Sequence, residues 1–521
     1  SSNLNLLNEN ILTYTTSFKE HAFDVVAGVT FQSNHEERTY SEAQDFPNYT
    51  LGANNLGLAD KPLPPSGSVQ EWGLNSYLGR LNYRFKDRYL FTVTGRIDGS
   101  SRFGNNNRYG FFPSGAFAWR ISDEAFLKSS KVVSDLKARV SYGITGNDGI
   151  GLYSSLSQYG TGRTVFGDQQ VLMTQASRIA NPDLKWEKTA QFDVGFDLGL
   201  YNNRLQFTAD YYVKTTSDLL LGVQLPVTTG FTSVTRNVGS LENKGFEFGI
   251  NTVNIDGVVK WTSNGNISFN QNKVLKLNDA DQYLVGATYG AGTSIVKVGE
   301  PVGSFYGNVF DGIWQTTDEI KAAGAMARSG DLPGALKYKD LSGDGVFNEA
   351  TDRQILGNGL PKFIYGFTNT VSFKGMDLSI FIQGVQGNQI MNYTRRSMDS
   401  SDPSQAFLKS YYESAWRADK PSQTSPSIRQ WRPTNTDSYF VEEGSFLRLK
   451  NVSLGYNLPL KSKYLNKARV YISGQNLLTF TKYRGYDPEV NSDFNSNTSY
   501  GVDVYAYPSA RTYTIGASFS F

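Results

Sequence analysis

The sequence predicts an antiparallel, up-and-down transmembrane β-barrel, and the 521 residues supply about 15 of its strands, with long extracellular loops. Three observations predict this fold. Segments of about ten residues alternate apolar and polar side chains, which a strand places on opposite faces and a helix would mix. Short and long connections alternate along the chain. The apolar faces are rich in aromatic residues, because the chain holds 31 Tyr and 33 Phe.

The composition excludes several other classes. Lys and Arg number 50 against 48 Asp and Glu, so no strongly basic surface points to nucleic acid. The chain has no Cys and only two His, His21 and His35, which removes disulfide frameworks and thiolate chemistry. No nucleophile with a base and an orienting partner can be assigned, so we expect no enzyme. No apolar run approaches the roughly 18 residues that a membrane helix needs.

The alternation defines each strand in turn. In the segment 189–200, for example, Phe192, Val194 and Phe196 oppose Asp193 and Asp197. The predicted strands are 4–16, 22–32, 74–85, 89–98, 110–121, 136–145, 189–200, 204–215, 244–254, 260–271, 362–373, 376–386, 445–458, 468–478 and 511–521.

The connections give the predicted barrel its direction. The short ones, such as 86–88 and 374–375, are expected in the periplasm, and the long ones, such as 272–361 and 387–444, outside the cell. A closed barrel is favoured because hydrocarbon offers no hydrogen-bond partner to the backbone groups at the edge of an open sheet. The last strand ends on Phe521, and a terminal aromatic is typical of bacterial outer-membrane proteins.

Seven stretches of the chain resemble the SusC/RagA-like TonB-dependent transporters of Bacteroidetes outer membranes. In order, the similar stretches are 181–200 (NPDLKWEKTAQFDVGFDLGL), 210–221, 237–250, 301–314 (PVGSFYGNVFDGIW), 338–369, 438–459 and 468–490. The resemblance covers nearly all of the chain but only the C-terminal part of the family's architecture. Such proteins are expected to have a plug domain, a TonB box and 22 strands. We therefore expect residues 1–521 to be a fragment or a cleaved half, with the plug domain and the N-terminal strands absent from this chain.

The resemblance implies active import of an oligosaccharide or an oligopeptide across the bacterial outer membrane. It also implies a SusD-like surface lipoprotein as a lid, the TonB system as the energy source through the missing N-terminal region, contact with outer-membrane lipid, and a dimer of SusC–SusD pairs. The alternatives are a passive porin, an assembly or adhesion barrel, and a soluble β-rich carbohydrate-binding protein.

One segment of the long loop 272–361 has the spacing of an EF-hand calcium loop. Oxygen ligands fall at relative positions 1, 3, 5, 7 and 9, with Gly345 at position 6 for the sharp turn. Two departures weaken the match, because position 3 is Ser and the last carboxylate is at position 13. A glycine-rich turn without metal is the alternative to a structural Ca²⁺ site. The candidate ligands are Asp340, Ser342, Asp344, Val346, Asn348 and Asp352.

Four tryptophans in the long loops are candidates for binding substrate. Sugars present C–H faces that pack on aromatic rings, and peptides offer apolar side chains. The competing interpretation is packing inside the loops or contact with a lid protein. The four residues, expected to be exposed, are Trp72, Trp314, Trp416 and Trp431.

Overall fold

A computed structural model describes residues 1–48, 50, 54–231, 233–277, 282–285, 294–399, 408–428, 436–459, 465–490, 492 and 498–521. The main element is a sheet of 15 strands in which each strand follows its neighbour in the chain. All 15 predicted strands are confirmed, and most ends differ by a few residues. The strand predicted at 22–32 extends to Tyr40 and that predicted at 74–85 begins at Ser66, so Trp72 lies on a strand rather than in a loop. The chain divides into two compact units, residues 1–120, 139–193 and 214–240, and residues 121–138, 194–213 and 241–521.

The strands of the large sheet have the following bounds, in their order across the sheet: β1 (Ser2–Phe18), β2 (His21–Tyr40), β5 (Ser66–Phe85), β6 (Tyr89–Ser100), β7 (Tyr109–Arg120), β8 (Val133–Asn147), β11 (Glu187–Leu200), β12 (Leu205–Ser217), β15 (Ser240–Asp256), β16 (Val259–Lys276), β23 (Phe363–Phe373), β24 (Met376–Gln386), β27 (Phe446–Leu458), β28 (Lys467–Thr481) and β30 (Thr512–Ser520).

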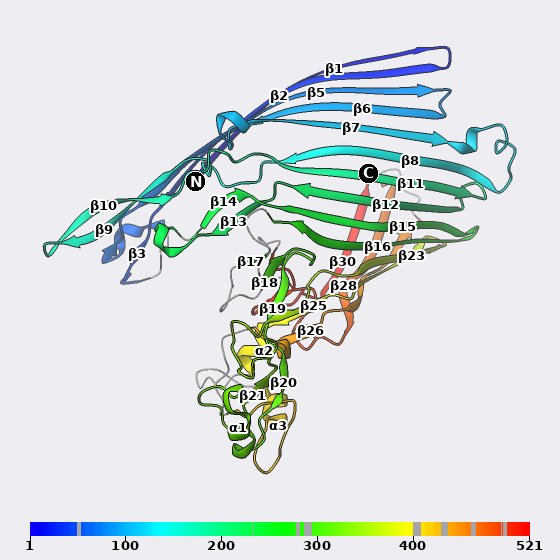
Figure 1. Ribbon diagram of the computed structural model, residues 1–521. Coiled ribbons are helices and arrows are strands. Elements are labelled where there is room, and N and C mark those ends of the chain that lie inside the picture. Colours follow the sequence, from blue (N-terminus) through cyan, green and yellow to red (C-terminus); the bar gives the residue numbers. More distant parts are fainter. Residues whose placement is uncertain are drawn as a thin grey trace. The chain divides into compact units, whose positions relative to one another are not determined.

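In the first unit, β1, β2, β5, β6 and β7 lie side by side as an antiparallel ladder (Figure 1). Tight turns fix its register. Lys86 and Asp87, with φ of 56° and 51°, lie in the turn between the paired residues Phe85 and Tyr89. Positive φ in such a short hairpin matches the right-handed twist of the strands that it joins.

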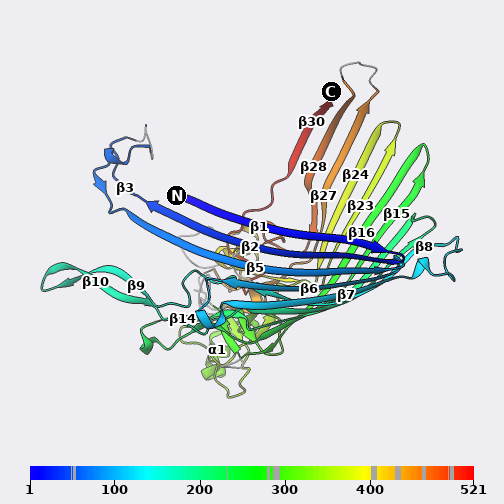
Figure 2. The same cartoon turned by 90° about the horizontal axis from the view of Figure 1, so that it is seen from above.

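Figure 2 shows the same arrangement in the second unit, where β23, β24, β27, β28 and β30 are adjacent strands. Lys374 and Gly375, with φ of 45° and 84°, form the two-residue turn between β23 and β24. The pairing of Trp261 with Val371 and of Phe269 with Phe363 places apolar side chains of neighbouring strands opposite each other on one face. The register therefore aligns the apolar face predicted for each of these strands with the apolar face of its neighbour.

The apolar face of the large sheet is exposed in the described residues. Tyr77 and Leu81 on β5 are each 41% exposed, and Trp261 and Phe269 on β16 are 39% and 37% exposed. A soluble sandwich would cover such a face with a second layer. Its exposure supports the prediction that it contacts lipid. The opposite face carries charged pairs, such as Arg96 Nε with Asp98 Oδ1 at 2.7 Å. Within the described chain, no helix has the length and apolar character needed to cross a membrane.

The buried clusters of the described residues are built mainly from the long connections. One cluster in the first unit consists of Phe103, Phe112, Ile150, Leu184 and Trp186. Another in the second unit consists of Phe305, Met391, Tyr393, Phe440 and Val502. The connections therefore fold into small structures of their own.

Short elements within these connections were not predicted from the alternation. They are β3 (Ala43–Gln44), β4 (Lys61–Pro62), β9 (Gln158–Phe166), β10 (Gln169–Arg178), β13 (Leu220–Gln224), β14 (Ser233–Asn237), β17 (Gln282–Val285), β18 (Ser294–Lys297), β19 (Ser304–Gly307), β20 (Phe310–Ile313), β21 (Leu336–Tyr338), β22 (Gln354–Gly357), β25 (Gln389–Asn392), β26 (Val441–Glu443) and β29 (Val502–Asp503), with helices α1 (Thr317–Ala323), α2 (Tyr393–Met398) and α3 (Lys409–Ser414).

Candidate functional site

Three long connections of the second unit fold together into one structure, which we call the loop platform and define as the described residues within 294–361, 387–444 and 482–506. Strands β26, β25 and β29, which come from two of these connections, form a three-stranded sheet. Asn308 of the remaining connection forms a parallel bridge with Asp437. The platform is therefore assembled from segments far apart in sequence, which suits a surface that must hold a fixed shape for a ligand or a partner.

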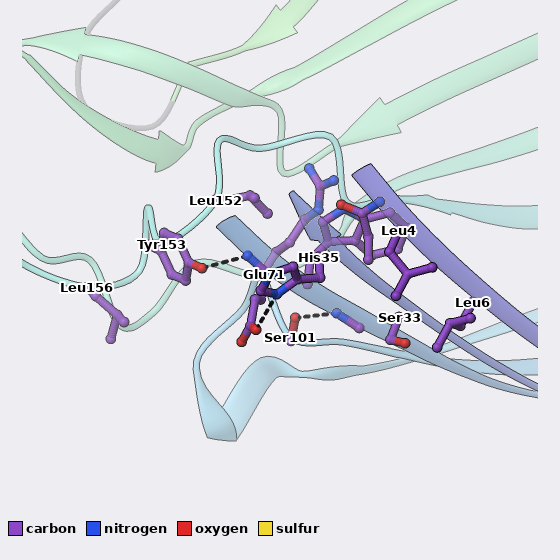
Figure 3. A pocket seen from close by; sticks show the side chains of 13 residues that line it. Leu4, Leu6, Ser33, His35, Glu71, Ser101, Leu152, Tyr153 and Leu156 are labelled. Atoms are coloured by element: carbon purple, nitrogen blue, oxygen red, sulfur yellow. Dashed lines mark hydrogen bonds and ion pairs between the residues drawn. The ribbon is translucent and has the colours of Figure 1, made fainter. Parts of the chain in front are cut away.

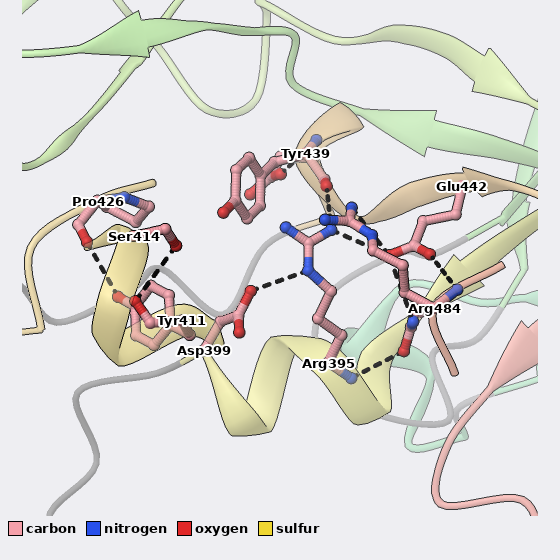
Figure 4. Close-up of polar contacts among 10 residues, drawn as sticks. Arg395, Asp399, Tyr411, Ser414, Pro426, Tyr439, Glu442 and Arg484 are labelled. Atoms are coloured by element: carbon pink, nitrogen blue, oxygen red, sulfur yellow. Dashed lines mark hydrogen bonds and ion pairs between the residues drawn. The ribbon is translucent and has the colours of Figure 1, made fainter. Parts of the chain in front are cut away.

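A buried arginine in α2 and the carboxylate that it binds, Glu442, lie at the contact between two connections of the platform (Figure 4). Arg395 donates from Nε to Asp399 Oδ2 at 2.9 Å, and from Nη1 to Glu442 Oε1 and the Tyr439 carbonyl, both at 3.0 Å. Its guanidinium lies 4.4 Å from the centre of the Tyr439 ring. Arg484, from the last long connection, lies 3.1 Å from Glu442 Oε1. One carboxylate thus binds two cations from different segments.

The charge of Arg395 is stabilised in this buried position. Burial alone would lower its pKa, but Tyr439, Asp399 and Glu442 together outweigh burial and raise the pKa above its ordinary value. The side chains of Arg395, Asp399 and Glu442 are 8%, 4% and 5% exposed. Arg395 therefore stays charged, and its ion pairs position α2 against β26.

A second buried carboxylate fastens the last long connection to α2. Asp503 accepts hydrogen bonds from Thr394 Oγ1 at 3.0 Å, from the Ala506 N–H at 3.1 Å and from the Tyr483 hydroxyl. Burial is the largest cause, and the hydrogen bond to Asp503 the second, of a pKa of Tyr483 far above its usual range. Asp503 therefore stays a satisfied acceptor, as buried carboxylates need.

The structure corrects the expectation that Trp314 is exposed. It is 2% exposed, its indole Nε1 donates to Asp331 Oδ2 at 3.1 Å, and Lys337 Nζ lies 4.9 Å from the centre of its ring. Trp416 is half-buried against a cluster of Ile313, Leu336 and Tyr338, and it donates to Gln315 Oε1 at 3.0 Å. The alternation of strands gives no information about side chains in such a loop core, so the pattern could not separate buried from exposed tryptophans. Trp431 lies outside the described residues.

Trp72 lines a cavity of about 550 Å³ in the first unit (Figure 3). Arg102 lies 5.3 Å from the centre of the Trp72 ring and donates to the Ile150 carbonyl at 2.7 Å. Tyr153 accepts from the Glu71 N–H at 2.8 Å, so a loop closes one side of the cavity. Binding of substrate by Trp72 stays a prediction, and the cavity gives it a place where an aromatic ring and a cation meet.

His35 lines the same cavity and lies between two carboxylates. Its Nδ1 is 2.7 Å from Glu71 Oε1, and its Nε2 is 3.1 Å from Glu37 Oε1. The hydrogen bonds with Glu37 and then Glu71 raise the pKa of His35. His35 follows the predicted membrane-spanning segment 22–32, so it belongs to the extracellular extension of β2. The composition analysis assigned His35 no role.

The calcium-like loop is organised by hydrogen bonds from its own backbone. Asp340 accepts from the Gly345 N–H at 2.8 Å and the Gly343 N–H at 2.6 Å. Asp352, which is fully buried, accepts from the Leu341 N–H at 3.0 Å. It also accepts from the N–H groups of Ser342 at 2.9 Å and Asn348 at 2.7 Å.

Much of the capacity of these two carboxylates is therefore already used by the turn, although oxygen lone pairs remain. In the part of the chain that the structure describes, no three or more His, Asp or Glu side chains are grouped so as to hold a metal ion. Calcium binding by this loop stays a prediction. Asp344 and Asn348 also accept hydrogen bonds from the loop backbone, from the N–H groups of Val346 and Ala350, both at 2.9 Å.

Comparison with known proteins decides the family. Residues 2–477 match the family model described as TonB dependent receptor-like, beta-barrel. The chain belongs to this family. TonB-dependent receptor P3 of Formosa agariphila is 39% identical over 531 residues, which cover 99% of this chain and 52% of that protein. TonB-dependent receptor SusC of Bacteroides thetaiotaomicron is 33% identical over 531 residues, covering 98% of this chain and 49% of that protein.

A solved structure of the RagAB peptide transporter matches with a TM-score of 0.85 and 27% identity, covering 100% of this chain and 56% of that chain. The resemblance to SusC/RagA-like transporters is thus confirmed, and so is the outer-membrane location that the family implies. The chain spans about half the length of the curated relatives that it matches.

Proposed function

We propose that this chain forms the wall and the external loops of a SusC-like active importer for an oligosaccharide or an oligopeptide. The observation that carries the proposal is the similarity to the RagAB peptide transporter over the whole of this chain. The exposed apolar face of the sheet and the charged opposite face support it, because they suit a wall between lipid and a wet lumen. The loop platform and the cavity at Trp72 are the proposed places for selecting the cargo.

We propose that a SusD-like surface lipoprotein covers the loops as a lid, in a dimer of such pairs. Support comes from exposed tyrosines on the last long connection, which offer large apolar surfaces with a polar end. Tyr486 is 65% exposed, Tyr505 is 51% exposed and Tyr507 is 94% exposed. The buried salt bridges around Arg395 would keep such a contact surface rigid.

We propose that the remaining strands and the plug domain belong to the N-terminal part of a longer chain. Strands β1 and β30 are the two outer strands in the order of the sheet, and an unpaired edge in hydrocarbon leaves backbone groups unsatisfied. About seven further strands would complete the family's barrel. The intact mass of the protein extracted from membranes tests this, since a mass near 57.8 kDa would contradict it.

Uptake by living cells tests the import proposal. The full-length gene is deleted in its host, and uptake of fluorescent oligosaccharides and oligopeptides is compared with the parent strain, with and without a protonophore. We expect deletion to abolish uptake of one cargo class, and the protonophore to abolish it equally. Uptake that survives the protonophore would instead support a passive porin. Restoration of uptake by the full-length gene is the control.

A further inference from the structure

An open cavity of about 770 Å³ lies on the apolar face of β12, β15 and β16. Tyr211, Phe246 and Phe269 form an aromatic floor, with the rings of Tyr211 and Phe246 4.8 Å apart. Phe246 is 49% exposed and Phe269 is 37% exposed. Because this face contacts lipid in an outer-membrane barrel, the floor is accessible to acyl chains and is shielded from water-soluble cargo.

A second, more polar cavity of about 510 Å³ continues from the first. The two cavities share Asn270, Gln271 and Lys362, and the second adds Lys273 and Glu300. Apolar and polar cavities therefore meet at Lys362. Together the two cavities form a continuous strip, apolar at one end and polar at the other. This strip fits a molecule with an apolar part and a charged, hydroxyl-rich part.

The position along the strands places this junction at the outer edge of the membrane. Phe269 lies ten residues beyond Val259, which begins β16 at a short turn, and Phe246 lies ten residues before Asp256, which ends β15 at the same turn. Ten residues rise about 33 Å along a strand, or about 25 Å along the membrane normal at a tilt near 40°. That height equals the apolar band of an outer-membrane barrel, so Lys362 and Lys273 lie at the level of lipid headgroups.

The lysines supply positive charge that the surrounding protein only partly balances. Lys244 Nζ is 3.2 Å from Glu242 Oε1. The ammonium groups of Lys273 and Lys362, by contrast, are exposed and have no ion pair within the described ranges. The stem of Lys362 crosses Gly387, where a Cβ would lie 2.7 Å from the lysine Cγ. Gly387 thus leaves the space in which the Lys362 stem lies at the junction of the cavities.

We propose that this strip binds an outer-leaflet glycolipid, with acyl chains on the aromatic floor and a phosphorylated sugar headgroup against Lys362 and Lys273. Phosphate carries the negative charge that the two ammonium groups lack, and its strong acceptor oxygens suit them. The sugar hydroxyls would meet the polar wall at Asn358 and Gln389, which line the second cavity. The aromatic floor lies on the lipid-facing side of the wall, whereas Asn358 and Gln389 belong to the loop platform, so the proposed site runs from the lipid-facing side to the platform.

Lipid analysis of the purified full-length protein tests the proposal. Native mass spectrometry measures binding of a diphosphorylated, acylated glucosamine disaccharide and of its dephosphorylated form, and circular dichroism checks the fold of each variant. We expect the double variant K273Q/K362Q to bind the phosphorylated lipid at least tenfold more weakly than the native protein does. We expect the native protein to bind the dephosphorylated lipid with the same low affinity. The matched control is K374Q in the turn between β23 and β24, which should bind as the native protein does.

Three outcomes would overturn the proposal. Equal binding of both lipids would show ordinary boundary lipid, and unchanged binding by K273Q/K362Q would remove the two lysines from the site. Displacement of the lipid by millimolar inorganic phosphate would assign the site to free phosphate. Phe246→Ala supplies an independent measurement, because it removes part of the acyl floor without touching charge and should weaken binding several-fold.

Discussion

Arg395 in α2 and Glu442 in β26 are 47 residues apart in the sequence, yet Arg395 Nη1 lies 3.0 Å from Glu442 Oε1 with both side chains almost fully buried. This pair joins the two ends of the connection between β24 and β27. It therefore ties α2 to β26 across that connection.

Removing one partner of this pair should destabilise the platform. Glu442→Gln leaves the buried Arg395 charge only partly compensated, and such losses cost about 3–5 kcal/mol. We expect the variant to be cut by protease within 387–444 at lower temperature than the native protein, while barrel strands stay protected. The control is Glu413→Gln, which removes an exposed pair with Lys409 and should change stability by less than about 0.5 kcal/mol. Equal protease sensitivity of the two variants would contradict the structural role of Arg395.

The large sheet was predictable because its side chains repeat with a period of two over ten or more residues. An apolar face suited to lipid contact and hydrogen-bonded pairing between strands act together there, so local pattern and overall fold agree. The long connections have no such repeat. Arg395, Glu442 and Asp503 come from separate stretches, and nothing near any one of them in sequence reveals its partners.

The candidate site residues were predictable only where a known binding geometry sets the spacing between them in the sequence. Asp340 and Asp352 were selected by the calcium-loop spacing, and the structure does bring both to one turn. The tryptophans were selected by residue type alone, and Trp314 is buried. The cavity lined by Lys362 and Phe246 combines three separate strands, so its position became visible only with the register.

Asp352 should hold its turn in a pH-dependent way. Burial favours the neutral acid, but hydrogen bonds from the backbone of Asn348, Ser342 and Leu341 outweigh it and lower the pKa of Asp352. A lowered pKa stabilises the folded loop above the ordinary Asp pKa near 4, and the stabilisation is lost as the pH falls through the lower folded value. We expect amide hydrogen exchange at residues 341–348 to rise below about pH 4. Asp352→Ala should show the fast exchange already at pH 7.

Calcium binding by the same turn is checked by calorimetry on the full-length protein. If Asp340 and Asp344 ligate Ca²⁺, the titration releases heat in the native protein, and D340N/D344N loses it, because a hard cation needs charged oxygen ligands. Asp318→Asn, in the first turn of α1, is the control for loss of charge nearby. A native titration without heat, repeated after chelation of resident metal, would leave the turn as a purely hydrogen-bonded structure.

Trp72 and Trp314 should respond differently to the same substitution. Trp72 lines an open cavity, so Trp72→Ala should raise the half-saturating cargo concentration for uptake several-fold at normal protein level. Trp314 is in a core, so Trp314→Ala should cost about 3–5 kcal/mol and lower the amount of folded protein. Unchanged uptake kinetics in Trp72→Ala would remove this cavity from the cargo path.

His35 supplies a pH-dependent contact at the extracellular end of β2. Its hydrogen bonds with Glu37 and then Glu71 raise its pKa, so the contact stabilises the fold fully below the unfolded His pKa near 6.5 and is lost as the pH rises through the folded value. NMR titration of the His21→Asn variant, which leaves one histidine in these 521 residues, should give a His35 pKa above the ordinary value. Glu71→Gln in that background should lower the pKa toward the ordinary value, whereas Glu20→Gln, at the periplasmic turn, should leave it unchanged. A His35 pKa that is unaffected by Glu71→Gln would show that the short Nδ1 contact does not persist in solution.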